Sequence, residues 1–320
     1  MQSLRSWPIF REGRIEGGVI FEKIERRYQP FSSLASRTLG TLNQDGVGSG
    51  IEYSFNKQLK GQNGKAMFQR LSRGVWKPLF DVDDVKPLDG YDIQTTLDVN
   101  IQDVAETALR KRLKETEAAF GSVIVMEVAT GYVKAISNLE RNAAGTGYVE
   151  SYNYAVGDMG SVEPGSTFKL VSMLALLEEN KISPNDMIET GNGVYRFYGQ
   201  PMVDAKNGGY GTITIRQAFE KSSNVAISKL VDRHFGSSPS KFLAYMEKVG
   251  LAQPLSLQLI GEGKPFFKTP GAKDWYGTSL PWISIGYESE LNPIHTLAFY
   301  NAVANGGKMV KPLFVKSVSN

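Results

Sequence analysis

The sequence contains no cysteine, and its only histidines are His234 and His295. Without cysteine the chain can form no disulfide, no thiolate nucleophile and no cysteine-based zinc site. Two histidines give little support for a Ser-His-Asp triad or a multi-histidine metal centre, and both fit the end or start of a helix better than a catalytic role. We therefore expect no metal and no other cofactor.

Long apolar runs and long basic tracts are also missing. No stretch approaches the roughly 18 consecutive apolar residues of a membrane span, and the N-terminal residues lack the apolar core of a signal peptide. The 36 basic and 33 acidic residues give a net charge of +3. In the run EKIERRYQPF, Glu22 and Glu25 favour a solvated surface over a nucleic-acid patch, so we expect no nucleic acid as a partner.

The regularity of the sequence changes near residue 90. Residues 1–90 are rich in glycine, arginine and turn residues, with short β-like pieces and no long helical period, and the segment KPLDG then marks a linker or turn. Beyond it the pattern predicts strands over 92–97, 122–128 and 132–137, and helices over 101–113, 166–180, 217–221, 225–235 and from Pro293 to just before Gly306. The last two strands should form a hairpin, and Asp98 or Asn100 should cap the first helix. The helix over 166–180 is apolar almost all round, which predicts that it is buried.

Ser166 and Lys169 lie at the start of that apolar helix, three residues apart. Residues at i and i+3 share a helix face, so the hydroxyl and the amine can meet. The preceding Pro164-Gly165 places the serine at the helix N-terminus, where free backbone N–H groups favour an oxyanion. Burial and the helix dipole should lower the pKa of Lys169, which makes a neutral amine available as the base that a serine nucleophile needs.

The bare S-x-x-K spacing is a weak signal on its own. The pairs Ser54/Lys57 and Ser238/Lys241 match it as well. The first of these serines lies in a β-like segment, and the second is followed by a proline and opens no buried helix. Only Ser166 combines a preceding Pro-Gly with a long apolar helix. From this motif alone, an N-capping serine beside a solvated lysine is as good an interpretation as catalysis.

A second polar element is the trio Ser222-Ser223-Asn224 between two predicted helices. A hydroxyl of this trio could relay a proton, and its amide could hold a substrate carbonyl. The alternative is structural, because Ser223 or Asn224 could cap the helix that follows. Capping and catalysis are compatible for different residues of the trio.

In this order, the two elements match the S-x-x-K and S-x-N motifs of penicillin-binding proteins and serine β-lactamases, which a K-T-G motif follows. EPGSTFKL resembles the nucleophile segment of high-molecular-mass penicillin-binding proteins, and KSSNVAISKL resembles their second motif. Two further segments resemble the opening of their transpeptidase domain, DGYDIQTTLDVNIQDVAETAL and GSVIVMEVATGYVKAI. A third resembles a later region of it, SIGYESELNPIHTLAFYNAVANGGKMVKP. The non-catalytic pedestal of class B members is resembled by two N-terminal segments, RYQPFSSLASRTLG and GIEYSFNKQLKG. The resemblance covers nearly the whole chain in collinear order. It is strongest to the division-type class B enzymes, and the elongation-type enzymes are close.

This resemblance implies an α+β fold with two domains. Residues 1–90 would form a pedestal domain, and residues 91–320 a serine β-lactamase/transpeptidase-like domain with an antiparallel sheet covered by helices. The implied activity is that of a peptidoglycan D,D-transpeptidase, which cross-links cell-wall stem peptides through an acyl-serine and binds penicillin covalently.

The resemblance also implies a role for each site residue. Ser166 is then the acylated nucleophile and Lys169 its general base. Ser222 passes a proton toward the leaving group, and Asn224 binds the peptide amide. The backbone N–H of Ser166 supplies half of the oxyanion hole.

The third motif of the family is the one departure from the pattern. No K-T-G or K-S-G occurs in the chain. Lys268-Thr269-Pro270-Gly271 is not a substitute, because its proline lacks the backbone N–H that an active-site strand offers. We expect the third motif beyond Asn320, so that the catalytic domain is incomplete in this sequence. The 320 residues alone should then acylate poorly, because they would lack the second oxyanion donor and the strands beside the 122–137 hairpin.

Partners and location follow from the same resemblance. It implies stem peptides and β-lactam antibiotics as ligands, other cell-division membrane proteins as partners, and a periplasmic or extracytoplasmic domain anchored to the inner membrane by a helix outside this sequence. A β-lactam sensor or β-lactamase relative is one alternative, although the pedestal-like residues 1–90 argue against it. A non-catalytic scaffold of the division machinery is the other, supported only by the missing third motif.

Overall fold

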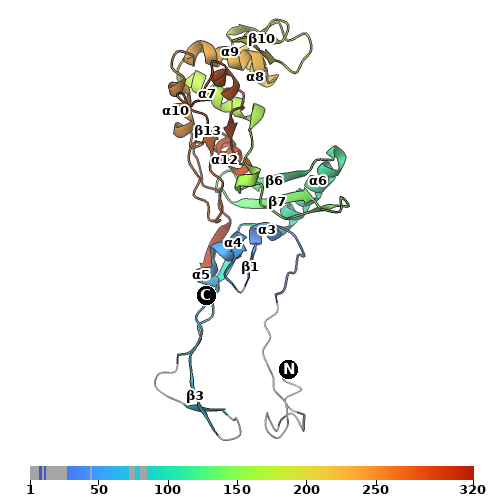
Figure 1. The fold of residues 1–320 in the computed structure, drawn as a ribbon, viewed down its shortest axis with the longest axis vertical. Coiled ribbons are helices and arrows are strands. Elements are labelled where there is room, and N and C mark those ends of the chain that lie inside the picture. Colours follow the sequence, from blue (N-terminus) through green and yellow to red (C-terminus); the bar gives the residue numbers. More distant parts are fainter. Residues whose placement is uncertain (1–6, 9–10, 12–26, 44, 72–75, 80–84) are drawn as a thin grey trace. The chain divides into compact units, whose positions relative to one another are not determined.

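The structure of the protein is a computed structural model that describes residues 7–8, 11, 27–43, 45–71, 76–79 and 85–320 (Figure 1). The chain divides into two units, Met1–Ser33 and Leu34–Asn320, and the elements described here belong to the second. The acidic residues Glu22 and Glu25 lie outside the described residues. The domain boundary near residue 90 stays a prediction.

Short elements make up the described part of residues 34–90. They are α3 (Ser36–Leu39), β1 (Thr41–Leu42), β2 (Gly48–Ser49), α4 (Gly50–Ser54), α5 (Asn56–Leu59), β3 (Met67–Arg70) and β4 (Trp76–Leu79). β1 pairs with β2, and β3 with β4, both antiparallel. The expectation that Ser54 lies in a β-like segment is wrong, because this serine ends helix α4. Helices of four or five residues are too short to leave a 3.6-residue period in the sequence.

Two antiparallel sheets follow, with a long helix against the larger one. The elements are β5 (Asp92–Thr95), α6 (Val99–Thr116), β6 (Phe120–Met126), β7 (Val133–Arg141), β8 (Tyr148–Val149) and, from the end of the chain, β15 (Val315–Ser319). The order β6-β7-β8 is antiparallel, which confirms the predicted hairpin, and β15 pairs with β5. Asp98 caps α6, as one of the two predicted alternatives had it.

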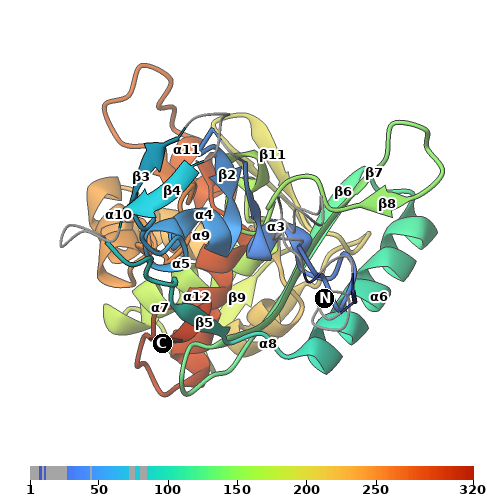
Figure 2. The ribbon, with the colours of Figure 1, turned by 90° about the horizontal axis from the view of Figure 1, so that it is seen from below.

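Helix α6 lies along β6 and β7 (Figure 2). The Gln102 side chain ties the two layers together, because it accepts a hydrogen bond from the backbone N–H of Ile136 (2.8 Å) and donates one to its carbonyl (2.9 Å). Val133, Ile136 and Leu139 of β7 are fully buried. The sheet therefore has one well-packed central strand.

The remaining elements form the helical part of the fold. The helices are the 3₁₀ turns η3 (Asp158–Gly160) and η4 (Gly165–Phe168), then α7 (Lys169–Glu178), α8 (Ile215–Glu220), α9 (Asn224–Phe235), α10 (Pro239–Lys248), α11 (Ser279–Ile283) and α12 (Pro293–Ala304). The strands are β9 (Met187–Glu189), β10 (Val194–Phe197), β11 (Gln200–Val203), β12 (Thr212–Thr214), β13 (Phe266–Phe267) and β14 (Ser289–Glu290). These strands form two-stranded antiparallel ladders, β9 with β12, β10 with β11 and β13 with β14.

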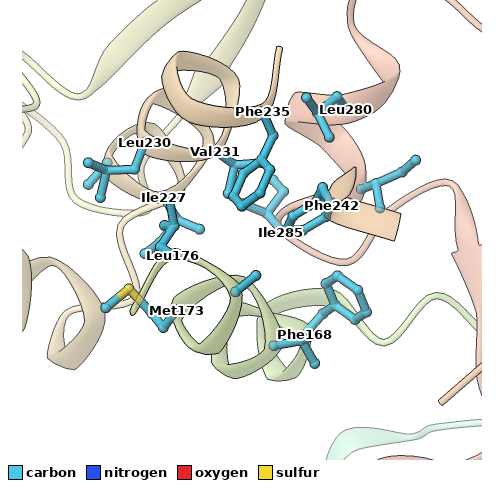
Figure 3. Close-up of a cluster of buried hydrophobic side chains, with 14 of the residues drawn as sticks. Phe168, Met173, Leu176, Ile227, Leu230, Val231, Phe235, Phe242, Leu280 and Ile285 are labelled. Atoms are coloured by element: carbon cyan, nitrogen blue, oxygen red, sulfur yellow. The ribbon is translucent and has the colours of Figure 1, made fainter. Parts of the chain in front are cut away.

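Helix α7 is the centre of the larger hydrophobic core. Its Ala175 and Leu176 are fully buried, and Figure 3 shows Leu176 next to Ile227 of α9, with Phe235 and Phe242 nearby. The buried helix predicted over 166–180 is thus confirmed, but its first turn is 3₁₀ and its α-helical part ends at Glu178.

Helix α10 corrects a second expectation. Ser238 does open a helix with a buried face, since Pro239 occupies the N1 position and Phe242, Tyr245 and Met246 are buried. Proline is well tolerated at that position because its missing N–H has no helical partner there. Among the described residues, no helix combines the length and the apolarity needed to cross a bilayer.

Candidate active site

Ser166 lies in η4, directly before the buried helix α7. The turn is held by a close approach of two glycines: the backbone N–H of Gly165 donates to the carbonyl of Gly286 (3.0 Å). Gly286 has φ 89°, and a Cβ there would lie 2.1 Å from the Gly165 carbonyl oxygen. Only glycine fits this position, and the contact fixes the backbone on which the serine is carried. The hydroxyl-bearing residue itself is exposed.

Lys169 is the first residue of α7, and it is 1% exposed. Its amine lies 3.2 Å from Ser166 Oγ, 2.9 Å from Ser222 Oγ and 2.7 Å from the Ser222 carbonyl oxygen. It also lies 2.6 Å from Asn224 Oδ1. The structure thus brings the other three residues singled out in the sequence within hydrogen-bond reach of the Lys169 amine.

Burial lowers the pKa of Lys169 from 10.5 to about 8, and the nearby carboxylate of Asp204 works in the opposite direction. Desolvation disfavours the ammonium form, because the charge loses its hydration. The larger effect is burial, so the amine has a substantial neutral population near neutral pH. A neutral amine beside a serine hydroxyl is the arrangement that general-base activation of a nucleophile requires.

The other two side chains come from the turn before α9 and from the first residue of that helix. Ser222 has a left-handed backbone, with φ 54°, which a non-glycine residue adopts only at some cost. Ser223 is the N-cap of α9, and its Oγ accepts a hydrogen bond from the Ala226 N–H (3.0 Å). Asn224 donates through Nδ2 to the Val203 carbonyl (2.8 Å), which turns its Oδ1 toward the lysine. Ser223 thus caps the helix, whereas Ser222 and Asn224 place polar groups against the Lys169 amine.

Asp204 is a site residue that the sequence analysis missed. It is 4% exposed and follows β11 directly. Its carboxylate accepts hydrogen bonds from Ser223 Oγ (3.0 Å to each oxygen) and from the Val225 N–H (3.0 Å). A single carboxylate therefore holds the turn that carries Ser222 and also acts electrostatically on Lys169.

The residues interpreted as structural in the sequence have partners elsewhere. Lys241 pairs with Glu179, and Lys268 pairs with Asp274 (3.3 Å) and Glu288 (3.0 Å). These lysines are engaged with carboxylates and not with a serine hydroxyl.

Both histidines also lie at the helix ends expected of them. His234 lies in the last turn of α9, and His295 is buried in the first turn of α12, where its Nε2 is 3.4 Å from a Glu262 carboxylate oxygen.

Comparisons with known proteins agree with this geometry. Residues 121–320, more than half of the chain, match the penicillin-binding protein transpeptidase domain family. Penicillin-binding protein PbpB of Mycolicibacterium smegmatis is 29% identical over 300 residues, which cover 92% of this chain and 45% of that protein. Peptidoglycan D,D-transpeptidase FtsI of Escherichia coli K12 is 26% identical over 306 residues, 94% of this chain and 50% of that protein.

Solved structures give the same result. Penicillin-binding protein 3 of Mycobacterium tuberculosis, solved without ligand and with aztreonam or ampicillin, has a TM-score of 0.73 and 26% identity, covering 92% of this chain and 61% of that one. The chain belongs to the penicillin-binding protein transpeptidase family, and its α+β transpeptidase fold is confirmed. Its relatives include the FtsI and PbpB proteins, which confirms the resemblance to class B members of the division type. The chain spans about half the length of the curated relatives that it matches.

Proposed function

We propose that this chain carries out the acyl-transfer chemistry of a peptidoglycan D,D-transpeptidase, which cross-links cell-wall stem peptides. The observation that supports this most directly is the Lys169 amine, buried and within 3.2 Å of Ser166 Oγ and 2.9 Å of Ser222 Oγ. The related FtsI of Escherichia coli, named as a peptidoglycan D,D-transpeptidase, supports the substrate class.

In the proposed acylation step, neutral Lys169 takes the proton of the Ser166 hydroxyl while Oγ attacks a carbonyl carbon of the peptide. The resulting oxyanion accepts a hydrogen bond from the Ser166 backbone N–H. As the C–N bond breaks, the proton passes from Lys169 through the Ser222 hydroxyl to the leaving amine. The product is an ester between the peptide and Ser166, with a released amine.

In the second step the amine of another peptide attacks that ester carbonyl, and its proton returns through the same groups to Ser166 Oγ. Asn224 is placed to orient the peptide, because its side chain is fixed from both ends by Lys169 and the Val203 carbonyl. A β-lactam ring would acylate the same oxygen by opening its own amide bond. The aztreonam and ampicillin complexes of the Mycobacterium tuberculosis relative support β-lactams as ligands.

Labelling with fluorescent penicillin tests this proposal in the full soluble protein that carries the chain. Ser166→Ala should abolish covalent labelling, and Lys169→Arg should nearly abolish it, because a guanidinium cannot give up its proton. Ser238→Ala and Lys241→Arg are matched controls, since they alter an S-x-x-K pair on helix α10 and should label normally. Labelling that survives in Ser166→Ala would contradict the proposal, and rapid loss of the wild-type label would favour a β-lactamase.

The cellular setting belongs to the same proposal. We infer a pedestal within residues 1–90, an extracytoplasmic location with an inner-membrane anchor, and other division proteins as partners, from the named FtsI and PbpB relatives. A non-catalytic scaffold of the division machinery predicts that the wild-type protein takes up no penicillin. The labelling assay therefore separates the two functions as well.

A further inference from the structure

Two lysines lie beside the turn that carries Ser222, on the ring of one tyrosine. The Lys206 amine is 5.4 Å and the Lys221 amine 5.8 Å from the centre of the Tyr210 ring. Both lysines are exposed, and Lys221 directly precedes Ser222 in the chain. Cations are attracted to an aromatic face at these distances. Both positive charges thus lie near one aromatic ring, whose hydroxyl is bonded to the residue directly before Ser222.

The tyrosine is held in place from two sides. Its hydroxyl donates to the Lys221 carbonyl (3.3 Å), and its backbone N–H donates to Thr190 Oγ1 (3.3 Å). The loop before it turns tightly, because the Gly209 N–H donates to the Lys206 carbonyl (3.0 Å). A Cβ on Gly209 would lie 2.1 Å from the Gly193 nitrogen, so this loop packs closely against the backbone at Gly193. The ring that organises the lysines is therefore preorganised and does not depend on a ligand to form.

Neither lysine is neutralised by a carboxylate in the described part of the chain. The ion pairs there involve other lysines, such as Lys241 with Glu179 and Lys268 with Glu288. Glu220 precedes Lys221 in sequence but forms no ion pair with it. The Asp204 carboxylate, two residues before Lys206, is buried and occupied by Ser223 and Val225. Two like charges near one ring and without a carboxylate partner favour the binding of an anion.

We propose that Lys206 and Lys221, gathered on the Tyr210 ring, form a subsite for a carboxylate of the peptide substrate. This inference rests on the proposed function, in which the peptide lies against Ser222, the residue directly after Lys221. The anion is a carboxylate because that is the anionic group a peptide carries, and two flexible ammonium groups pair with it as point charges, without the planar fork of an arginine. The carboxylate belongs either to the peptide that acylates Ser166 or to the peptide that accepts the acyl group.

Two pairs of small substrates distinguish these sources. The first pair consists of acyl-donor thioesters of a D-alanine peptide that carry a carboxylate or the matching carboxamide on the same side chain. The second pair consists of an acceptor D-amino acid and its amide, compared by their capture of the acyl-enzyme. For each pair the measured quantity is the ratio of kcat/KM for the charged and the neutral compound, in the full soluble protein.

We expect the wild-type protein to prefer the charged compound in one pair. Lys206→Gln and Lys221→Gln should each lower that ratio by about 1.5- to 5-fold, the range of an exposed charge pair, and the preference should weaken with added salt. Lys248→Gln is the control, because Lys248 also lies over a tyrosine ring, 4.5 Å from the centre of Tyr245, but on helix α10. It should leave the ratio unchanged.

The outcomes separate this subsite from the proposed function. A double variant with the wild-type ratio in both pairs would overturn the subsite, as would a penicillin-labelled wild-type protein that shows no preference in either pair. A wild-type protein that takes up no penicillin would remove the function and the subsite together. If the double variant does not fold, Lys206→Gln alone decides, because this residue lies on an exposed loop.

Discussion

The pH dependence of acylation is the most direct consequence of the geometry around Lys169. Its pKa is about 8, because burial outweighs the opposing effect of Asp204. Only the neutral amine can take the proton of Ser166. The acylation rate should therefore rise with pH and level off once most of the amine is neutral.

The size of the effect follows from the two pKa values. At pH 7 a pKa of about 8 leaves about one amine in ten neutral, whereas the ordinary value of 10.5 would leave about three in ten thousand. Burial thus raises the population of the active form by about 300-fold. The rate should change about tenfold per unit between pH 6 and pH 7, and the curve should reach half its plateau near pH 8.

The assay is the rate of fluorescent-penicillin labelling between pH 5.5 and pH 9.5, corrected for hydrolysis of the free reagent. Two isosteric variants should move the midpoint in opposite directions. Asp204→Asn removes a carboxylate that stabilises the ammonium and should lower the midpoint. Asn224→Asp places a carboxylate against the amine and should raise it by about 1 to 3 units. A flat profile between pH 6 and pH 9, or a midpoint that moves the same way in both variants, would refute the general-base role of Lys169.

Three further substitutions test how the site is held. Gly286→Ala should slow penicillin labelling and lower the stability of the protein. Gly271→Ala is its control, because Gly271 has a similar φ of 94° but open space around it, so this variant should cost only the backbone strain. Thermal unfolding and labelling rates would distinguish the two variants. Leu176→Ala should lower the free energy of unfolding, measured in urea, by about 2–5 kcal/mol. Leu177→Ala should lower it clearly less, because the neighbouring Leu177 is 40% exposed. Ser223→Ala should cost about 1–2 kcal/mol through loss of the α9 cap, measured in the same way, and an unchanged stability would contradict that role.

The pairing of Ser166 with Lys169 was predictable because it is local. Two residues three apart at the start of a strongly apolar helix share one face, and the helix must be buried. The same holds for the hairpin of β6 and β7, whose strands are separated by a short turn. In both cases the number of residues between the two partners is enough to predict that they lie side by side.

Asp204 could not be found in this way. It lies 19 residues before Ser223, at the end of a short strand, and its hydrogen bonds to Ser223 and Val225 depend on how β11 packs against the start of α9. No periodicity connects those positions. The short helix α4 was not predicted for a different reason. Its five residues, Gly50–Ser54, form barely more than one turn. Tertiary packing, and not propensity, decides both.

The hydrogen-bond capacity of Lys169 limits what the site can do. Two of its four neighbours, the Ser222 carbonyl and Asn224 Oδ1, can only accept, and the Asn224 orientation is fixed by its donation to Val203. A neutral amine has two N–H groups and one lone pair, so these two acceptors take both donors. The lone pair is then left for a hydroxyl, which must donate: Ser166 at 3.2 Å or Ser222 at 2.9 Å. The amine can accept one hydroxyl proton at a time, and once charged it has three donors, so the third N–H can return that proton to either serine. The arrangement therefore permits proton transfer from one hydroxyl to the other through a single nitrogen, as acylation with release of an amine requires.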